Sequence, residues 1–155
     1  MRVDVIIPFY NENQNLEILC RELSNVIPKL KHSYKVLFID DGSTDDSYTV
    51  VKNNIKNIQY EIIQKKSNGG QTLAFESAFK ILNSDYSIRM DSDLQDDPKD
   101  LHKFDMILAN DFDIILGFRN KRKHILPLKI LTHVFDQMVK FLGFSNLKSS
   151  SGSFI

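Results

Sequence analysis

Tyr86-Ser87-Ile88-Arg89-Met90 leads directly into Asp91-Ser92-Asp93 at positions 86–93 of the sequence. A short run of β-forming residues that ends in turn-forming residues predicts a strand, here over residues 86–90. Asp91 and Asp93 follow that strand with one residue between them. If the backbone turns there, both carboxylates can reach one cation. The stretch therefore predicts a strand with an acidic site at its carboxyl end.

The rest of the chain alternates short apolar runs with segments of helical periodicity. This pattern predicts βαβ units, and therefore an α/β fold with a mostly parallel central sheet and helices on both faces. Further strands are expected over residues 3–7, 34–39, 60–63 and 112–116. Apolar stripes predict core-facing helices over residues 16–27 and 73–82, and a third helix, capped by Ser43 or Thr44, is expected to end near Asn54. Pro98 suits a first helical turn.

Length and composition limit the function classes. The 155 residues predict one domain, residues 1–155, and 20 basic against 20 acidic residues give a net charge near zero, which argues against a nucleic-acid binder. Cys20 is the only cysteine, which excludes an intramolecular disulfide and a zinc–cysteine cluster. The apolar run at the N-terminus is too short for a signal peptide, so we expect a cytoplasmic protein.

The last forty residues leave two questions open. A helix is expected over residues 126–142, and its charged residues exclude a simple membrane span. It is either a core helix or an interfacial helix that gives peripheral contact with a membrane. The chain ends in a serine-rich loop and Phe154-Ile155, which resembles the start of a strand. We therefore expect the domain to be truncated at its C-terminal end.

Polar residues follow the first, second and fourth predicted strands. In a doubly wound sheet these loops meet at the carboxyl edge, where ligands bind. Asp40 and Asp41 precede Gly42, so either carboxylate can face a base or ribose, or can instead cap the next helix. Asn68-Gly69-Gly70 allows close approach of the backbone to a ligand or a tight turn. The sequence lacks the glycine patterns of NAD-binding and P-loop proteins.

Asp91 and Asp93, with a carbonyl oxygen from Gln95, are candidate ligands for Mg²⁺ or Mn²⁺. Both ions prefer oxygen ligands and complete their coordination with substrate phosphates. The alternative is that these aspartates only form turns and cap helices. The neighbouring strand and loops favour the metal site.

The order Pro8-x-Tyr10-Asn11-Glu12, Asp40-Asp41-Gly42-Ser43, Asn68-Gly69-Gly70 and Asp91-x-Asp93-Leu94-Gln95 resembles family 2 glycosyltransferases of the Rossmann-like GT-A fold. The continuation to Asp96-Asp97-Pro98, with Gly117-Phe118-Arg119 and Arg122, looks most like the polyprenyl-phosphate sugar transferases. That group includes dolichol-phosphate mannose synthases and bacterial undecaprenyl-phosphate glucosyltransferases. The resemblance covers about residues 3 to 122.

The resemblance implies roles for individual residues. Nucleotide-sugar contacts would come from the four loops, namely Pro8, Tyr10, Glu12, Asp40, Asp41, Asn68, Gly69, Asp91 and Ser92. Asp91, Asp93 and Gln95 would hold the metal and the diphosphate. Arg119 and Arg122 would lie near the acceptor phosphate, or would belong to a solvated basic loop.

The implied reaction is metal-dependent hexosyl transfer with inversion, from a UDP- or GDP-sugar to a polyprenyl phosphate, at the cytoplasmic face of a membrane. Two other functions stay open. The acceptor could be a saccharide hydroxyl in surface polysaccharide or glycolipid synthesis, which would need a general base. The chain could also be a truncated module that binds the nucleotide sugar without turnover.

Overall fold

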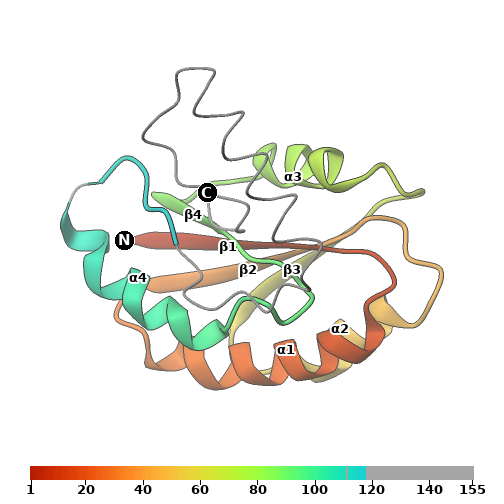
Figure 1. Cartoon of the computed structure of the whole chain (residues 1–155), viewed down its shortest axis with the longest axis horizontal. Helices are drawn as coiled ribbons and strands as arrows, with labels where there is room; N and C mark the ends of the chain where they lie inside the picture. Colours follow the sequence, from red (N-terminus) through yellow and green to blue (C-terminus); the bar gives the residue numbers. More distant parts are fainter. Residues whose placement is uncertain (111, 118–155) are drawn as a thin grey trace, which may run out of the picture. The chain divides into compact units, whose positions relative to one another are not determined.

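The computed structural model of the chain describes residues 1–110 and 112–117 (Figure 1). Strands and helices alternate, which confirms the α/β prediction. The elements are β1 (Arg2–Phe9), α1 (Asn13–Val26), β2 (Ser33–Asp40), α2 (Ser47–Asn54), β3 (Gln59–Gln64), α3 (Gln71–Phe79), β4 (Tyr86–Arg89) and α4 (Leu101–Ile107). Single 3₁₀ turns cover Ile27–Lys29, Pro98–Asp100 and Leu108–Asn110.

The four strands form one parallel sheet in the order β3-β2-β1-β4. In the register, Val5 of β1 lies between Val36 of β2 and Ile88 of β4. Since β2 lies on one side of β1 and β4 on the other, the strand order reverses at β1. The carboxyl end of β1 is therefore the point where a doubly wound sheet binds its ligand.

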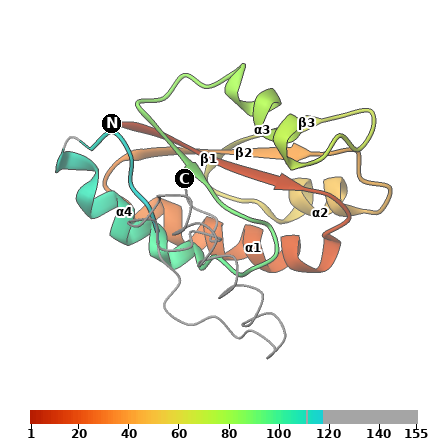
Figure 2. The same cartoon turned by 45° about the horizontal axis from the view of Figure 1, so that its top comes forward.

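Helices cover both faces of the sheet. Figures 1 and 2 show α3 on one face and α1, α2 and α4 on the other. Leu16, Leu19 and Leu23 of α1 are fully buried, as the predicted stripe requires. On the opposite face, Ala74 and Ala78 of α3 pack against Ile6, Leu37 and Ile39 of the sheet. Two alanines at helical spacing let α3 lie close to β1 and β2.

The predicted apolar stripe of α3 is only partly correct. Leu73 and Phe79 were expected in the core, but their exposed fractions are 47% and 57%. Small alanine side chains occupy the sheet-facing positions, so the larger residues on either side of them point outward. Pro98 begins a helical turn as predicted, and the Asp97 carboxylate caps it by accepting a hydrogen bond from the Lys99 amide at 2.9 Å.

Two other predictions were wrong. Residues 112–117 form no strand, and the side chains of Phe112 and Ile114 are exposed. A strand needs a backbone partner, and this segment pairs with no strand of the described sheet. The helix expected after Gly42 ends at Asn54, as predicted, but neither Ser43 nor Thr44 caps it. It begins at Ser47, whose amide donates to Asp45 Oδ1 at 3.0 Å.

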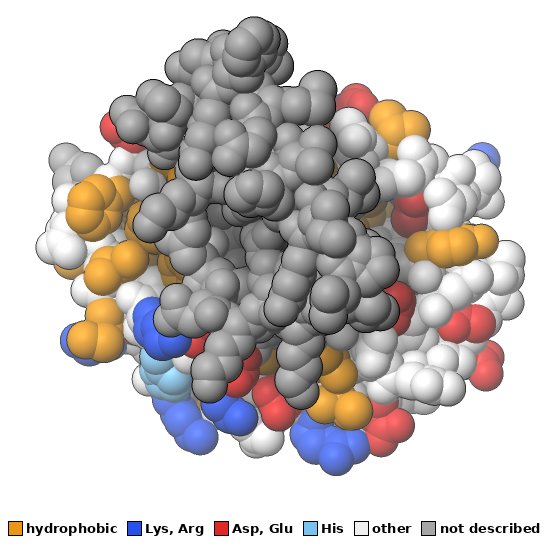
Figure 3. Space-filling view, in the orientation of Figure 1, with side chains coloured by type: hydrophobic (Ala, Val, Ile, Leu, Met, Phe, Trp, Pro, Cys, Tyr) orange, Lys and Arg blue, Asp and Glu red, His pale blue; other side chains and the backbone are white. Residues whose placement is uncertain are grey.

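The predicted helix over residues 126–142 and the predicted strand start at 154–155 lie outside the described residues. So does part of the predicted single domain, whose extent stays a prediction. Within residues 1–110 and 112–117, no helix is both long and apolar enough to cross a bilayer. On the face shown in Figure 3, basic and acidic side chains are mixed along the lower edge.

Candidate functional site

A cavity of about 250 Å³ lies at the carboxyl edge of the sheet, where the strand order reverses. Loops that follow β1, β2, β3 and β4 all contribute to its wall. It is lined by Pro8, Phe9, Tyr10, Glu12, Asp41, Asn68, Gly70, Gln71, Ala74 and Ser92. Most of the predicted nucleotide-sugar contacts therefore surround one cavity. Gly70, and not the predicted Gly69, lies in its wall.

Asn11 joins the loop after β1 to the loop after β2. Its backbone has φ 54°, a left-handed conformation that asparagine tolerates better than most residues. Its amide donates to Ser43 Oγ at 3.1 Å, and its Oδ1 accepts from the Thr44 amide at 2.8 Å. One residue further on, the Glu12 amide donates to Ser47 Oγ at 2.8 Å. These bonds hold Tyr10 and Glu12 in place against the second loop.

Asp41 is a buried carboxylate that accepts hydrogen bonds from both ends of the loop after β3, residues 65–70. Lys65 Nζ donates to its Oδ1, and the amides of Gly69 and Gly70 donate to its oxygens at 3.1 and 2.7 Å. Burial would raise the pKa of Asp41, but the hydrogen bonds from Lys65, Gly69 and Gly70 outweigh it and hold the pKa below its usual value. Asp41 is therefore ionised at neutral pH and fixes the glycine loop beside the cavity.

Asp40 has a different position from its neighbour. It is fully buried, with Oδ1 accepting from the Ser43 amide at 2.7 Å and Oδ2 accepting from Gln64 Nε2 at 3.1 Å. It does not line the cavity. The nucleotide contact of Asp40 stays a prediction. Its carboxylate does not cap the next helix, the alternative role, because α2 begins only at Ser47; it binds within its own loop and to β3.

Gly42 lets the second and third loops touch. Its φ is +78°, and a Cβ at this position would lie 2.6 Å from the carbonyl carbon of Ser67. No side chain fits such a gap without moving the backbone. The close approach places Asn68 at the cavity wall, where the sequence predicted it.

The loop after β4 turns between the two predicted metal ligands. The Asp91 amide donates to Asp96 Oδ2 at 3.1 Å, and the Gln95 amide donates to Asp93 Oδ1 at 3.0 Å. Leu94 has φ 61°, which completes the turn. Asp96 is 2% exposed and folds the loop back onto the end of β4, a role that the sequence analysis missed in a run of five aspartates.

Asp91 does not line the cavity itself but lies next to Gln71, which does. Gln71 Nε2 and Arg89 Nη2 each approach Asp91 Oδ1 at 3.4 Å. Ser92, the next residue, is buried in the cavity wall. The acidic end of β4 therefore lies beside the cavity that the loops after β1, β2 and β3 also line. Asp93 is half-buried and Gln95 is exposed, and neither lines the cavity.

The residues at this loop fit a divalent ion in their chemistry. Asp91, Asp93 and Gln95 offer the oxygen ligands that Mg²⁺ and Mn²⁺ prefer. Within the described residues, no group of three or more histidine, cysteine, aspartate or glutamate side chains is arranged to hold a metal ion. Diphosphate and water oxygens would therefore have to complete the coordination.

Two predicted site residues are not described by the structure, and one residue at the site was not predicted. Arg119 and Arg122, expected near the acceptor, lie outside the described residues. Lys65, which pairs with Asp41, was missed, because a single lysine after a strand carries no distinctive pattern. Its position directly after β3, at the carboxyl edge, was the available signal.

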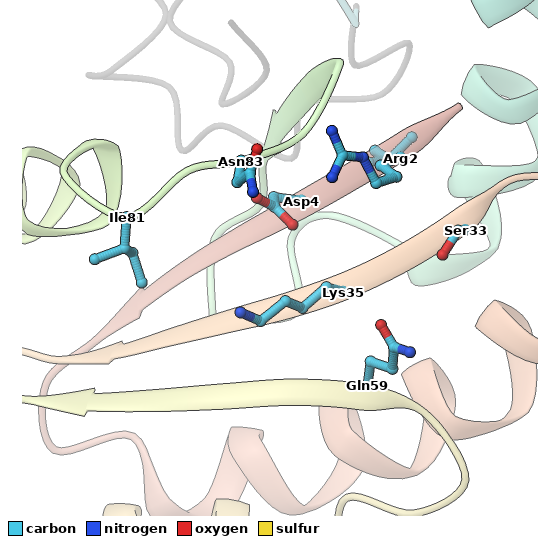
Figure 4. Close-up of a pocket in the computed structure, with 8 residues that line it drawn as sticks. Arg2, Asp4, Ser33, Lys35, Gln59, Ile81 and Asn83 are labelled. Atoms are coloured by element: carbon cyan, nitrogen blue, oxygen red, sulfur yellow. The ribbon is translucent and has the colours of Figure 1, made fainter.

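A second cavity of about 210 Å³ lies near the amino ends of the strands (Figure 4). Arg2, Asp4 and Lys35 contribute charged side chains to it, and Lys35 also forms an ion pair with Glu61 at 2.7 Å. It contains none of the predicted site residues. In doubly wound sheets ligands bind at the opposite end of the strands, so the first cavity is the candidate active site.

The sequence matches known proteins over most of its length. The family Glycosyl transferase family 2 matches residues 4–150. The undecaprenyl-phosphate 4-deoxy-4-formamido-L-arabinose transferase of Sodalis glossinidius is 30% identical over 124 residues, covering 79% of this chain and 38% of the relative. The dodecaprenyl-phosphate galacturonate synthase of Rhizobium johnstonii is 26% identical over 132 residues. The match covers 83% of this chain and 39% of that relative. This chain thus spans about two fifths of the length of these relatives.

Solved structures show the same fold. Glucosyl-3-phosphoglycerate synthase from Mycobacterium tuberculosis in complex with UDP is 16% identical with a TM-score of 0.67, covering 99% of this chain and 55% of that one. S. aureus TarS 1-349 in complex with UDP-GlcNAc is 22% identical with a TM-score of 0.64, covering 81% and 37%. Mannosyltransferase PcManGT from Pyrobaculum calidifontis, in complex with GDP-Man and Mn²⁺, is 20% identical with a TM-score of 0.56, covering 69% and 32%. Together with the loops at the carboxyl edge, the match over residues 4–150 establishes that this chain belongs to glycosyl transferase family 2.

Proposed function

We propose that this chain binds a nucleoside diphosphate sugar in the cavity at the carboxyl edge. The observation that carries the proposal is that Tyr10, Glu12, Asp41 and Ser92 line one cavity. Asp91 lies beside this cavity, 3.4 Å from the lining residue Gln71. An aromatic ring and hydrogen-bonding groups on one side suit a nucleoside. The acidic loop on the other side suits a diphosphate neutralised by a divalent ion.

The two sides of the cavity would divide the work of binding. The backbone beside Tyr10 is held by the amide bonds of Asn11 and Glu12, and the Asp41 carboxylate is held by Lys65, so this part of the cavity wall is formed before the nucleotide arrives. Prepositioned groups bind without a large loss of conformational entropy. The nucleoside would therefore bind first to the rigid loops, leaving its diphosphate directed toward the end of β4.

Asp91 and Asp93, with Gln95, would hold Mg²⁺ or Mn²⁺ together with the diphosphate. When bound, the ion would neutralise the negative charge that grows on the departing diphosphate. PcManGT, which shares the fold, was solved in complex with GDP-Man and Mn²⁺. That complex supports the use of a divalent ion at this kind of site.

The acceptor that we propose is a polyprenyl phosphate. An oxygen of the acceptor phosphate would attack the anomeric carbon from the face opposite the nucleotide, forming a new C–O bond. The bond from the anomeric carbon to the diphosphate oxygen would break, and its electron pair would leave with the nucleoside diphosphate. Because a phosphate is already an anion near neutral pH, this step needs no strong general base.

The names of the matched relatives support this acceptor, since both include a polyprenyl phosphate. Arg119 and Arg122 would bind the acceptor phosphate, with the protein at the cytoplasmic face of a membrane. The alternatives are transfer to a saccharide hydroxyl and nucleotide-sugar binding without turnover. A hydroxyl acceptor would require a general base, whereas a phosphate acceptor would not.

Calorimetric titration of the chain with UDP-sugars and GDP-mannose, with and without Mn²⁺, tests the binding proposal. We expect Asp91→Asn and Asp93→Asn to remove most of the metal-dependent gain in affinity. Asp85→Asn is the matched control, because Asp85 precedes the same strand at its other end and binds the Arg2 amide at 2.8 Å. Unchanged metal-dependent binding in both site variants would contradict the metal assignment.

Transfer from a labelled nucleotide sugar to a short polyprenyl phosphate, compared with transfer to simple glycosides, tests the acceptor. We expect label only in the polyprenyl phosphate product. Label in the glycoside would favour the hydroxyl acceptor. Binding without label in either product would favour a module that lacks turnover.

A further inference from the structure

Arg89 is a basic residue at the end of β4, immediately before the acidic loop. Its side chain projects toward α3, on the same face of the sheet as Ile6, its partner in the register. The Arg89 side chain is 28% exposed and that of Asp91 is 20% exposed, so the two charges are only partly screened by water. Arg89 is neither a proposed nucleotide-sugar contact nor a proposed metal ligand.

The aromatic ring of Phe75 determines where the Arg89 guanidinium lies. The guanidinium carbon is 5.0 Å from the centroid of that ring, a cation–π contact. Phe75 in turn stacks on Phe79 with a centroid separation of 6.2 Å and packs against the core beneath α3. Arg89 Nε is buried without a hydrogen-bond partner in the part of the chain that the structure describes. The Phe75 ring therefore holds the Arg89 guanidinium in a fixed position, although Arg89 Nε donates no hydrogen bond there.

From this place the guanidinium reaches the predicted metal ligand. Arg89 Nη2 lies 3.4 Å from Asp91 Oδ1, and Gln71 Nε2 approaches the same oxygen at the same distance. Charge-assisted hydrogen bonds between such groups are usually about 2.8 Å long. The Arg89–Asp91 ion pair is therefore longer than a tight charge-assisted hydrogen bond. Arg89 offsets the charge of Asp91 without binding it strongly.

We propose that Arg89 is a positioning residue that acts as the resident counter-cation of Asp91 and sets the affinity of the acidic loop for a divalent ion. Binding of the ion exchanges one cation for another at the Asp91 carboxylate, and Arg89 stays on the Phe75 ring after the exchange. The inference rests on the proposed metal site at Asp91. It adds that Arg89 weakens the binding of a divalent ion at this site, because a fixed positive charge opposes a second cation.

Titration of the folded chain with Mn²⁺ alone, followed by the electron paramagnetic resonance signal of free Mn²⁺, tests this inference. We expect Arg89→Met to bind Mn²⁺ about two- to fivefold more tightly than the wild type, which is the range for a partly exposed charge pair. Arg89→Lys keeps the charge and should stay closer to the wild type than Arg89→Met. Added KCl should reduce the difference, because salt screens the repulsion.

Arg21→Met is the matched control, since Arg21 is an exposed residue paired with Glu17 on α1. It removes the same charge and should leave Mn²⁺ affinity unchanged. If Arg89→Met does not fold, as judged by circular dichroism, Arg89→Gln carries the same expectation. Folded neutral variants that bind Mn²⁺ no more tightly than the wild type would overturn the inference.

The outcomes also separate this inference from the proposed function. If Asp91→Asn leaves Mn²⁺ binding unchanged, the proposed metal site is wrong. If Asp91→Asn abolishes binding and Arg89→Met matches the wild type, the metal site stands and only the role of Arg89 fails.

Discussion

Lys65 donates a hydrogen bond to Asp41, and the exposed fractions of the two side chains are only 19% and 6%. Asp41 follows β2 and Lys65 follows β3, the neighbouring parallel strand. Their pairing joins two loops at the carboxyl edge of the sheet. Because the same carboxylate also binds the amides of Gly69 and Gly70, Asp41 holds the loop after β2 against both ends of the loop after β3.

Replacing Lys65 by methionine should destabilise the fold. Asp41 would keep its backbone donors but lose its only charged partner among the described residues. We expect the free energy of unfolding to fall by about 1–3 kcal/mol, the range for a buried group that loses a hydrogen-bond partner. Urea denaturation measures this change. Lys66→Met is the control, because Lys66 is exposed, and equal losses in both variants would contradict the role of Lys65.

The pH dependence of stability should report the ionised Asp41. Burial raises its pKa, but the bonds from Lys65, Gly69 and Gly70 lower it more, so the folded-state pKa lies below the unfolded value. Such a group stabilises the fold above its unfolded pKa, about 3.9 for aspartate, and this stabilisation is lost as the pH falls further. The difference in unfolding free energy between wild type and Asp41→Asn should be constant from about pH 7 to 5 and shrink below about pH 4. A difference that grows on acidification would contradict this assignment.

Gly42 and Gly70 provide a matched pair of substitutions. Both have positive φ, +78° and +83°, but only Gly42 has backbone atoms within 3 Å of the position of a Cβ. Gly70→Ala should therefore cost only the conformational strain, about 1–3 kcal/mol. Gly42→Ala should cost more and should also weaken nucleotide binding, because it pushes residues 67–68 away. Thermal unfolding of the two variants compares the costs, and equal losses would show that the close contact is unimportant.

Asn11 should matter through both its backbone and its side chain. Asn11→Gly keeps access to the left-handed conformation and removes the hydrogen bonds between the Asn11 side chain and Thr44, of which the bond from the Thr44 amide is the shortest. Asn11→Ala removes the same bonds and adds strain, so we expect it to be less stable than Asn11→Gly by about 1 kcal/mol. Both variants should bind nucleotide more weakly than the wild type, which calorimetry measures. Wild-type affinity in both would mean that the link between the two loops does not hold Tyr10 and Glu12.

Much of this fold could be predicted because its signals are local. The four described strands are short apolar runs bounded by turn residues, and each was predicted to within two residues at either end. The position of the site at the carboxyl edge could also be predicted, because parallel strands place the loops after β1, β2 and β4 at the same edge of the sheet. The strand expected over residues 112–116 failed because a strand is defined by its neighbour, and an apolar run does not show whether one exists.

The sequence could not predict which side chains of the site bind one another. Asp40 and Asp41 are adjacent and chemically identical, yet one supports a loop and the other binds the glycine turn. Adjacent residues at the end of a strand point in opposite directions, so the register of the sheet decides which carboxylate faces the cavity.

Residue order and type by themselves determined the α/β class, the parallel sheet and the acidic end of β4, since each depends on neighbours along the chain. Only the tertiary structure decided that Lys65 neutralises Asp41, that Asn11 ties two loops together and that Arg89 lies on Phe75 beside Asp91. These contacts join residues from different loops and elements. Their energies depend on distance and burial in space, which the order of residues alone does not express.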